Sequence, residues 1–433
     1  MNIKKIKFQA PTGMHDILPE DQKYFRKIVE VAEGILHFYG FGKIDIPVLE
    51  QTELFSKGTG LSTDIVQKQM YNLKTKGDDL LTLRPEFTPG IVRAYIEHGM
   101  VSLPQPIKLY AVGPVFRYEN PQAGRFRQFN HLDVEIIGEK SPVKDAQLIQ
   151  IFYNIFKELK IKNLMVEVNS IGDSQCRSYY KKLLMSYLRS REHSVCGDCR
   201  RRMKENPLRF LDCKEEKCQP IKAQAPQTID HLCEECHNHF KEVLEFLDEI
   251  EIPYRLNPYL VRGLDYYTKT VFEIFQESES KGETAPLALA GGGRYDGLVK
   301  LLGGKDASAC GGAAGIERIV YLMKTEEEKK QKEVSLQGSQ VFLAQLGDLA
   351  KRRSLKLLEE FRKARIDVAE SFGRDSLRAQ LGKANNMKTL YTLILGQREA
   401  LEGTVIIKDM VSGRQETVKM EKAVEQIKKK LKK

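Results

Sequence analysis

The sequence of 433 residues contains no apolar run that approaches the length of a membrane-spanning helix. Residues 1–10 also lack the pattern of a signal peptide, so we expect a cytoplasmic protein with no membrane partner. The phosphate-binding pattern GxxxxGKS/T occurs nowhere, and a glycine-rich run at 290–298 fails the GxGxxG pattern because position 296 is Asp. These absences exclude a P-loop and a Rossmann-type phosphate turn.

Positive charge is concentrated in the last quarter of the chain. Residues 335–433 hold 21 Lys and Arg against 12 Asp and Glu, an excess of +9 out of a net charge of +10. This excess points to a polyanion as partner, and a solvated basic surface ending in a Lys-rich helix is the alternative. The same residues alternate between strand and helix patterns as in an α/β unit, with strands at 340–344, 367–369, 389–395 and 404–409 and helices at 349–364 and 376–384.

The stretch from Gly113 to Gly138 predicts two strands joined by a long loop that carries Arg125 and Arg127. Arg117 and Glu119 share one face of the first strand. The second strand alternates between an apolar face and a polar face, formed by Leu132, Val134 and Ile136 and by His131, Asp133 and Glu135. Such a hairpin can pack on a core and present ionisable groups to an anion, although an ordinary solvated hairpin shows the same pattern.

Hydrophobic periodicity predicts the remaining elements of the first 250 residues. Helices are expected at 21–39, 91–98, 145–159, 178–190 and 237–249, and a strand at 80–83. A strand at 43–49 contains Pro47, so we expect it at a sheet edge that is open to pairing with another subunit. Residues 50–76 are polar and read as a loop.

Four arginine-bearing or glycine-rich runs are candidates for a ligand site. In Arg84-Pro85-Glu86-Phe87-Thr88-Pro89 the prolines restrict the backbone around a carboxylate and a hydroxyl that suit an amine or imidazole; a plain turn is the alternative. The runs at 260–268 and 287–297 read as strands, and the run at 311–320 reads as a Gly-rich strand that leads into a helix carrying Arg318. Their glycines allow close approach of a ligand. Together, Arg117, Arg125, Arg262 and Arg318 suit a nucleoside triphosphate bound on an antiparallel sheet, with displacement at a phosphate.

Six of the eight cysteines lie between 196 and 236, as Cys196-x2-Cys199, Cys213-x4-Cys218 and Cys233-x2-Cys236. Two CxxC pairs can place four thiolates on one tetrahedral metal, which predicts a structural Zn2+ on Cys196, Cys199, Cys233 and Cys236. Cys213 or Cys218 could replace one of these, and nearby histidines are further alternatives, namely His231, His237 and His239. A cluster of reduced cysteines without metal is the other interpretation. Cys176 and Cys310 need be no more than small buried residues.

Several of these runs resemble one enzyme class. Phe116 to Glu119, Arg127 to Phe129 and Glu135 resemble motif 2 of class II aminoacyl-tRNA synthetases, and Gly315 to Arg318 resembles motif 3. The helix ending at Tyr39 with Pro47 resembles motif 1. The runs RGLDYYT (262–268) and AGGGRYDGL (290–298) resemble the two signatures of histidyl-tRNA synthetases, and the resemblance covers the whole chain in order.

The resemblance implies an α+β fold with an antiparallel-sheet catalytic domain, a helical insertion and a C-terminal α/β anticodon-binding domain. The expected boundaries are 1–173 and 256–323 for the catalytic core, 174–255 for the insertion, 324–334 for a linker and 335–433 for the last domain. The implied partners are L-histidine, ATP with Mg2+, tRNA(His) and a second copy of the chain. The implied reaction forms histidyl-adenylate and pyrophosphate, then transfers histidine to the terminal ribose of the tRNA.

The resemblance also implies roles for individual residues. Arg117 and Arg262 would bind the α-phosphate from opposite sides, with Arg262 as the catalytic arginine. Phe129 would stack on adenine against Arg318, and Glu119 would orient the ring. The histidine pocket would be formed by Glu86, Phe87, Thr88, Arg117, His131, Glu135, Arg262, Tyr266, Tyr267 and Tyr295. The tRNA acceptor stem would meet a loop holding Asn120, Gln122 and Arg125.

Two alternatives and one departure stand beside this interpretation. The family commonly has Gln where this chain has His131, so one contact to histidine would differ. A regulatory subunit of ATP phosphoribosyltransferase resembles these enzymes, but it typically lacks the RGLDYY run and the anticodon-binding domain, and this chain has both. A zinc-dependent nucleic-acid-binding protein would explain the cysteines and the basic tail, and would leave the Arg, Gly and Tyr runs unexplained.

Overall fold

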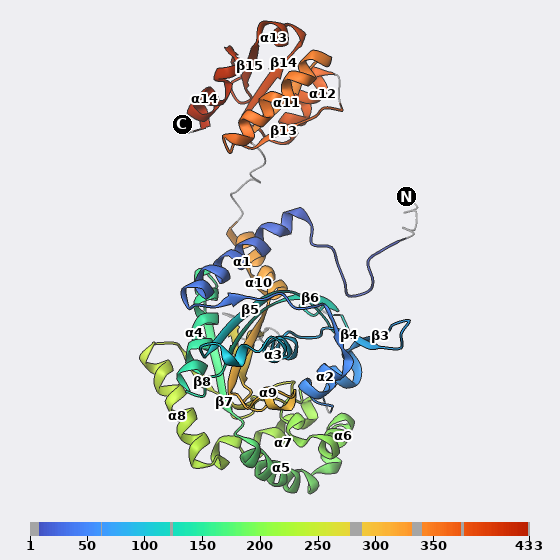
Figure 1. Ribbon diagram of the computed structural model, residues 1–433, viewed down its shortest axis with the longest axis vertical. Helices are drawn as coiled ribbons and strands as arrows, with labels where there is room; N and C mark the ends of the chain where they lie inside the picture. Colours follow the sequence, from blue (N-terminus) through green and yellow to red (C-terminus); the bar gives the residue numbers. More distant parts are fainter. Residues whose placement is uncertain are drawn as a thin grey trace. The chain divides into compact units, whose positions relative to one another are not determined.

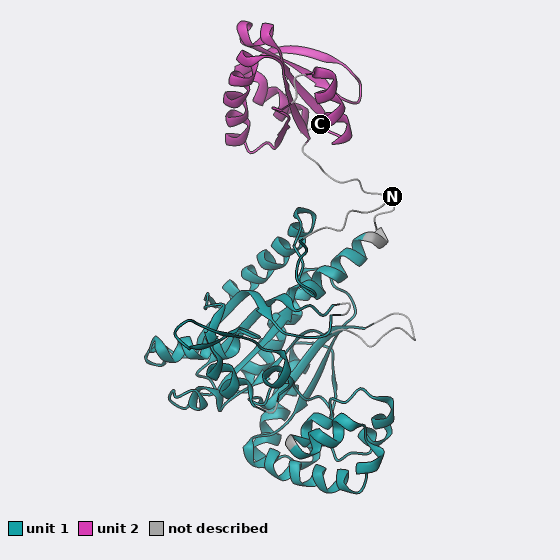
Figure 2. Cartoon of the chain, turned by 90° about the vertical axis from the view of Figure 1, so that its right-hand side faces the viewer, with its two compact units in different colours: residues 1–329 teal, residues 330–433 magenta. Residues whose placement is uncertain are grey.

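The structure is a computed structural model that describes residues 8–61, 63–121, 124–277, 288–330, 340–373 and 376–431. The chain divides into two compact units, Met1–Lys329 and Lys330–Lys433 (Figure 2). In the described ranges, no helix is both long and apolar enough to cross a membrane.

An eight-stranded sheet organises the first unit (Figure 1). Its order is β1-β5-β6-β11-β10-β9-β7-β8, antiparallel except for the two edge strands, which pair in parallel with their neighbours. The predicted hairpin is its β5–β6 pair. Of the strand predicted at 43–49, only Lys43 lies in the edge strand, and Leu49 begins a strand of another sheet. The strands are β1 Gly42–Lys43, β5 Ile107–Phe116, β6 Gln128–Ile137, β7 Leu164–Ser170, β8 Tyr254–Leu256, β9 Thr268–Gln276, β10 Ala288–Arg294 and β11 Ala309–Gly315.

Each face of this sheet has its own apolar core. The first core packs the apolar side of β6, with Leu132, Val134 and Ile136, against three helices, α1 Pro19–Phe38, α4 Val143–Glu158 and α8 Glu234–Glu249. The second core joins the opposite face to α3 Thr88–Glu97 and α9 Leu298–Leu301. The alternation of apolar and polar residues on β6 therefore separates a structural face from a face that carries ionisable groups.

Residues 50–76 are not a loop, contrary to the sequence-based expectation. They form α2 Thr52–Thr59, a π-helical turn at Ile65–Gln69 and β3 Tyr71–Lys74. Strand β3 and β2 Leu49–Gln51 pair on both sides of β4 Leu80–Leu83 in a separate three-stranded sheet. The polar composition hid these elements because their stability comes from pairing and from buried residues such as Phe55 and Thr59.

The segment predicted as a strand at 260–268 is irregular until Thr268, where β9 begins. Its polar groups bond outside a sheet: Asp265 N donates to Thr59 O, and Arg177 Nη1 donates to the carbonyl oxygens of Asp265 and Tyr267. The backbone groups of this segment therefore bond to the Arg177 side chain and to the end of α2, and not to a neighbouring strand as the sequence pattern suggested.

The helices after β7 form a separate cluster, drawn in green in Figure 1. They are α5 Ser174–Arg189, α6 Gly197–Glu205 and α7 Gln219–Ala223. A small core of their own includes Tyr180, Leu184 and Phe210. Helix α8 follows but packs on the main core through Phe240, Val243 and Leu247.

The second unit is an α/β domain with a five-stranded sheet in the order β13-β12-β14-β15-β16. Its strands are β12 Val341–Gln345, β13 Val368–Glu370, β14 Tyr391–Leu395, β15 Thr404–Asp409 and β16 Gln415–Lys419. Its helices are α11 Asp348–Lys363, α12 Leu377–Asn386, α13 Gln397–Glu402 and α14 Met420–Leu431. The last helix of the first unit, α10, runs from Ile316 to Lys330 and extends into the segment predicted as a linker, of which 331–334 lie outside the described residues.

Candidate active site

A pocket lies on the polar face of the main sheet, between β6, β9, β10 and β11 and the loops at 84–88 and 257–267. Eleven of the residues singled out in the sequence line it: Glu86, Thr88, Arg117, Glu119, Arg125, Phe129, His131, Arg262, Tyr266, Tyr267 and Arg318. The strands and loops thus bring together side chains that are more than 200 residues apart in the sequence.

Four arginines line this pocket, and three of them, Arg117, Arg262 and Arg318, are the candidates for binding the nucleotide. Arg117 is held by a bond from Nε to Pro85 O at 2.9 Å, and Arg318 by a bond from Nη1 to Ala288 O at 2.7 Å. Neither forms an ion pair with a carboxylate within the described part of the chain, so their charge is available to an anion. Burial, and then the cations of Arg125 and Arg117, lower the pKa of Arg318, as expected for positive groups crowded around an anion site.

The third arginine, Arg262, is paired with Glu273 of β9. Burial opposes its charge, but Glu273 and the neighbouring tyrosines keep the pKa of Arg262 above its usual range. The guanidinium lies over Gly291, where a Cβ would overlap its Nη1 atom. Gly291 is therefore required to let a charged group lie flat against the sheet.

Two buried carboxylates also belong to this site: Glu86 lines the pocket, and Glu135 bonds to Thr88, which lines it. Glu86 accepts hydrogen bonds from Thr59 Oγ1 at 2.6 Å and from Tyr266 OH at 2.8 Å. Glu135 accepts from Thr88 Oγ1 at 2.5 Å and from Tyr295 OH. Burial raises the pKa of both carboxyls, so each gains from a cationic ligand.

Asp133 lies beside Glu135 on the same face of β6. Burial, and then the Glu135 carboxylate, raise the pKa of Asp133 well above its usual range. Two adjacent buried carboxyls cannot both ionise at low cost, so burial beside Glu135 favours the protonated form of Asp133.

His131 of β6 also lines the pocket. Burial, and then the cations of Arg117, Arg318 and Arg262, hold the pKa of His131 well below its usual range, so the imidazole is neutral. Its Nδ1 atom is buried and has no hydrogen-bond partner in the described ranges of the chain. A buried polar atom without a partner at a pocket wall is suited to bonding a ligand.

Some predicted residues lie off the pocket wall. Phe87 is only 1% exposed and packs under the Arg84 guanidinium, and Tyr295 lies beneath the floor, bonded to Glu135. Asn120 is exposed at the start of the loop, and Gln122 lies outside the described residues.

The pocket also contains residues that the sequence interpretation did not single out as site residues, among them Asp133, Phe126, Glu273 and Glu317. Glu317 holds the backbone and side-chain amides of Asn130 at 2.8 to 2.9 Å, and so joins α10 to β6. The sequence contains one indication that Glu273 is a site residue, because it is the only charged residue in the apolar run from Val271 to Phe275.

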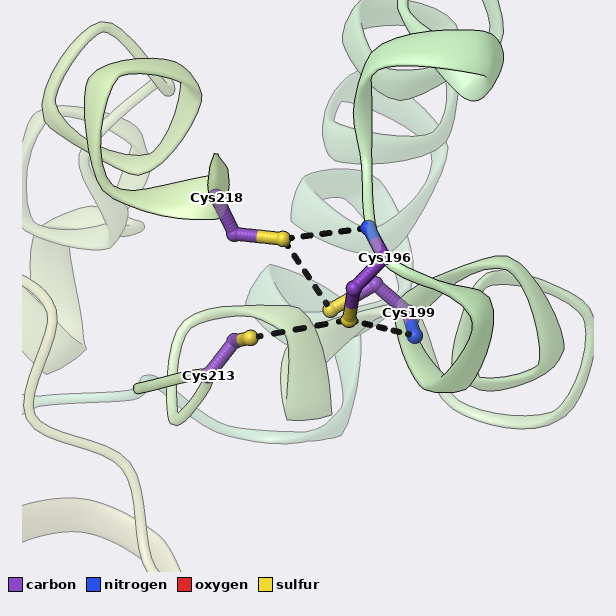
Figure 3. Close-up of side chains that lie close together, drawn as sticks. All are labelled: Cys196, Cys199, Cys213 and Cys218. Atoms are coloured by element: carbon purple, nitrogen blue, oxygen red, sulfur yellow. Dashed lines mark hydrogen bonds between the residues drawn. The ribbon is translucent and has the colours of Figure 1, made fainter. Parts of the chain in front are cut away.

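The predicted zinc ligands do not form one group, and this prediction is corrected. Cys196 and Cys199 gather with Cys213 and Cys218, whereas Cys233 and Cys236 gather with Asp173 and Cys176 (Figure 3 shows the first cluster). The two CxxC pairs lie at the N-termini of different helices, α6 and α8. The spacing of the cysteines in the sequence does not show whether these two N-termini are close in space. Of the alternative histidines, His231 packs against Tyr179 and Tyr180, and His239 lies 3.5 Å from Asp145.

Comparisons with known proteins give a consistent result. A family model described as histidyl-tRNA synthetase matches residues 13–319, and one described as an anticodon binding domain matches residues 340–430. A histidine–tRNA ligase of Dehalococcoides mccartyi is 40% identical over 424 residues, which are 98% of this chain and all of that protein. One of Desulfitobacterium hafniense is 42% identical over 410 residues, 94% of each chain.

Solved structures agree. The crystal structure of apo S. aureus histidyl-tRNA synthetase has a TM-score of 0.78 at 34% identity, and covers 97% of this chain and 100% of that one. A structure from Bacillus halodurans described as an ATP phosphoribosyltransferase regulatory subunit/histidyl-tRNA synthetase has a TM-score of 0.65 at 20% identity and shows a shared fold alone.

An antiparallel sheet that carries a pocket of arginines and buried carboxylates, followed by an anticodon-binding domain, defines a class II aminoacyl-tRNA synthetase. Within that class, the chain belongs to the histidyl-tRNA synthetase family. Its activity is that of a histidine–tRNA ligase, which activates histidine with ATP and transfers it to tRNA. The expected fold class, family and enzymatic activity are confirmed, and the regulatory paralogue is not favoured.

Proposed function

We propose that the pocket binds histidine at its carboxylate end and ATP at its arginine end, so that the histidine carboxylate meets the α-phosphate between Arg117 and Arg262. The observation that supports this proposal is the combination of buried, hydroxyl-bonded carboxyls and several arginines at one pocket. Glu86 lines the pocket with Arg117, Arg262 and Arg318, and Glu135 bonds to Thr88, which also lines it. No side chain has to form a covalent intermediate, because alignment and charge stabilisation supply the rate.

The histidine end matches the two polar parts of the amino acid. Histidine brings a cationic amine and an imidazole, and the buried carboxyls of Glu86 and Glu135 are already fixed by Thr59, Thr88 and two tyrosine hydroxyls. His131 supplies a neutral nitrogen at the pocket wall. We assign the recognition of histidine to this set, together with Tyr267 and Tyr295.

The nucleotide end matches a triphosphate and a flat ring. Phe129 and Arg318 both line the pocket, and we assign the adenine to the space between them, with Glu119 at the ring edge. The Arg117 guanidinium lies 5.6 Å from the Phe129 ring centre, so a ring stacked on Phe129 would bring its α-phosphate toward Arg117. Mg2+ enters with ATP and neutralises part of the phosphate charge.

Histidine-dependent exchange between ATP and pyrophosphate tests the proposal. The purified chain is expected to catalyse the exchange with L-histidine, and to lose at least about 10³-fold in kcat/KM with an amino acid that lacks the imidazole, because the buried carboxylate would be left unpaired. Equal exchange with histidine and with phenylalanine would contradict the assignment of the carboxylate end.

Histidine binding is expected to release protons near neutral pH. Burial raises the pKa of Glu135 to about 7, and a cationic ligand favours the ionised carboxylate. Below that value the carboxyl is largely protonated, so the affinity for histidine should rise as the pH rises through about 7 and then level off. Calorimetry in buffers of different ionisation heat measures the release.

The matched variant for this measurement is Glu135→Gln, which keeps the shape of the side chain without its proton. The release is expected to be smaller in this variant than in the wild type at the same pH. An equal release in the two proteins would show that Glu135 does not titrate on binding.

The RNA contacts proposed for this chain lie in two regions. The loop with Asn120 and Arg125 borders the pocket at its nucleotide end, where the tRNA acceptor end must arrive to accept histidine. The anticodon-binding unit carries the +9 excess of charge, which suits backbone phosphates and carries no sequence information by itself. We also propose that the enzyme works in the cytoplasm, where tRNA is charged.

We propose further that the chain is a homodimer. Phe38 is 84% exposed at the end of α1, and Val48 and Leu49 are exposed at the start of β2, an edge strand of the three-stranded sheet. Exposed apolar side chains next to an open strand edge suit a second copy of the chain. Light scattering at micromolar concentration should give a mass near twice 49.5 kDa.

The cluster of Cys196, Cys199, Cys213 and Cys218 is the zinc site that we propose in place of the predicted set. The distance between the two Sγ atoms is 3.9 Å for Cys196 and Cys213, and also 3.9 Å for Cys199 and Cys218 (Figure 3). Four sulfurs at about 2.3 Å from one zinc ion would be about 3.8 Å from each other. Two backbone N–H groups already point at the sulfurs, from Cys199 to Cys196 Sγ and from Cys196 to Cys218 Sγ.

Zinc at this cluster would brace the small core of the insertion, which includes three of the four cysteines. The Cys213→Ala variant is expected to lose one zinc ion per chain and to unfold at lower temperature, since the cysteines are part of the insertion's small core. Plasma mass spectrometry of the purified protein gives the metal count. Unchanged zinc in this variant would refute the site.

A further inference from the structure

A second group of metal-ligating side chains lies where the helical insertion begins and ends. The group consists of Asp173, Cys176, Cys233 and Cys236. Each residue offers one ligand atom, and these four atoms all lie within 4.8 Å of one another. Asp173 and Cys176 stand at the start of α5, and Cys233 and Cys236 at the start of α8, so 57 residues separate Cys176 from Cys233. Three soft sulfur donors and a carboxylate match the ligand preference of a thiophilic divalent cation.

We propose that this cluster binds a second structural zinc ion, independent of the one at Cys196, Cys199, Cys213 and Cys218. The four side chains supply a complete tetrahedral set, with three thiolates and one carboxylate oxygen. A closed set of four protein ligands leaves no position for substrate, so the ion has a structural role.

The two carboxylate oxygens of Asp173 can serve different roles, one capping the helix and the other binding a metal ion. Its Oδ1 atom accepts bonds from the backbone N–H groups of Gln175 at 2.9 Å and Cys176 at 2.8 Å. Its other oxygen, Oδ2, lies 3.9 Å from Cys233 Sγ. An N-cap needs only one oxygen, so Oδ2 is left to face the three sulfurs.

The second cluster repeats the construction of the first. In each, a pair of ligands three residues apart occupies the N-cap and the first turn of a helix: Cys196 and Cys199 on α6, Cys233 and Cys236 on α8. In each, the backbone N–H of the capping cysteine donates to a sulfur from another segment, Cys218 Sγ at 3.3 Å and Cys176 Sγ at 3.1 Å. Helix N-termini favour anionic sulfur, which is the form that binds metal.

The position of the cluster connects the insertion to the active site. Just before Asp173, the backbone of Ile171 and Gly172 bonds to Lys269 of β9, with two distances of 2.8 Å. Just after Cys176, Arg177 holds the carbonyl oxygens of Asp265 and Tyr267. A metal that joins the starts of α5 and α8 therefore fixes the helix from which Arg177 positions the RGLDYYT segment.

Metal counting on the full-length protein, purified under reducing conditions from zinc-supplemented cells, tests the proposal. The wild type is expected to contain two zinc ions per chain. Cys176→Ala and Cys213→Ala should each contain one, the double variant none, and Cys310→Ala, whose thiol is outside both clusters, should keep two. A wild type with a single zinc ion that Cys213→Ala removes would overturn the second site.

Two further measurements keep the test independent of misfolding. Asp173→Asn preserves the cap, because Asn and Asp cap equally well, and is expected to lose one zinc ion to a chelator at least about 10-fold faster than wild type. Cobalt-loaded Cys213→Ala should show a weaker thiolate charge-transfer band per ion than cobalt-loaded Cys176→Ala, since three thiolates replace four. Unchanged chelator kinetics, or a disulfide among these cysteines found by alkylation and mass spectrometry, would refute the proposal.

Discussion

Replacement of Arg262 by alanine is expected to slow histidine-dependent ATP–pyrophosphate exchange by about 10³-fold, the usual cost of removing one charged donor from a developing negative charge. The guanidinium is one of four that line the pocket, and its ion pair with Glu273 fixes its direction. The loss should fall mainly on kcat, because the extra charge on the α-phosphate arises in the transition state.

Two variants separate this chemical effect from loss of structure. Arg262→Lys keeps a cation beside Glu273 but not the planar fork, so it should remain folded and lose part of the activity. Arg255→Ala removes a half-exposed arginine that pairs with Glu167 and Glu277 on the sheet edge, and should leave exchange unchanged. Wild-type exchange in a folded Arg262→Ala protein would remove Arg262 from the catalytic role.

Substitution of Gly311 by alanine is expected to weaken histidine use by about 10- to 100-fold, a loss equivalent to one or two hydrogen bonds to a charged group. Gly311 of β11 lies opposite Glu135 of β6, and a Cβ there would overlap Glu135 Oε2. The carboxylate would have to leave Thr88 and Tyr295, its two hydroxyl partners. The KM for histidine in the exchange reaction reports the displacement.

Gly297→Ala is the matched control. Nothing lies within 4 Å of a Cβ built at Gly297, and its φ of −99° is open to alanine. Exchange and melting temperature should stay at wild-type values. If Gly311→Ala also behaves like wild type, then the Glu135 carboxylate is not required in its observed position for histidine binding.

The hairpin and its polar face could be predicted because strand periodicity is local. Leu132, Val134 and Ile136 alternate with His131, Asp133 and Glu135, and any sheet that buries the first set must present the second together. The strand predicted at 43–49 was wrong in extent, because only Gly42 and Lys43 pair at the sheet edge and Pro47 lies beyond them. The α/β order of the C-terminal unit followed from its alternating patterns.

Contacts between distant segments could not be predicted. The pairing of Arg262 with Glu273 depends on the irregular path of residues 257–267, which Arg177 and Thr59 fix from elsewhere in the chain. The cysteines show the same limit: Cys233 and Cys236 have the expected spacing, but their neighbours in space are Asp173 and Cys176. The spacing of a CxxC pair identifies two metal ligands at the start of one helix. It does not identify the segment that supplies the other two ligands.

A crystal structure with L-histidine and a non-hydrolysable ATP analogue would show how the pocket holds both substrates. We expect the histidine amine and imidazole at the Glu86 and Glu135 carboxylates, the adenine between Phe129 and Arg318, and the α-phosphate between Arg117 and Arg262. A triphosphate bound away from these three arginines, or histidine bound away from the two buried carboxylates, would contradict this expectation.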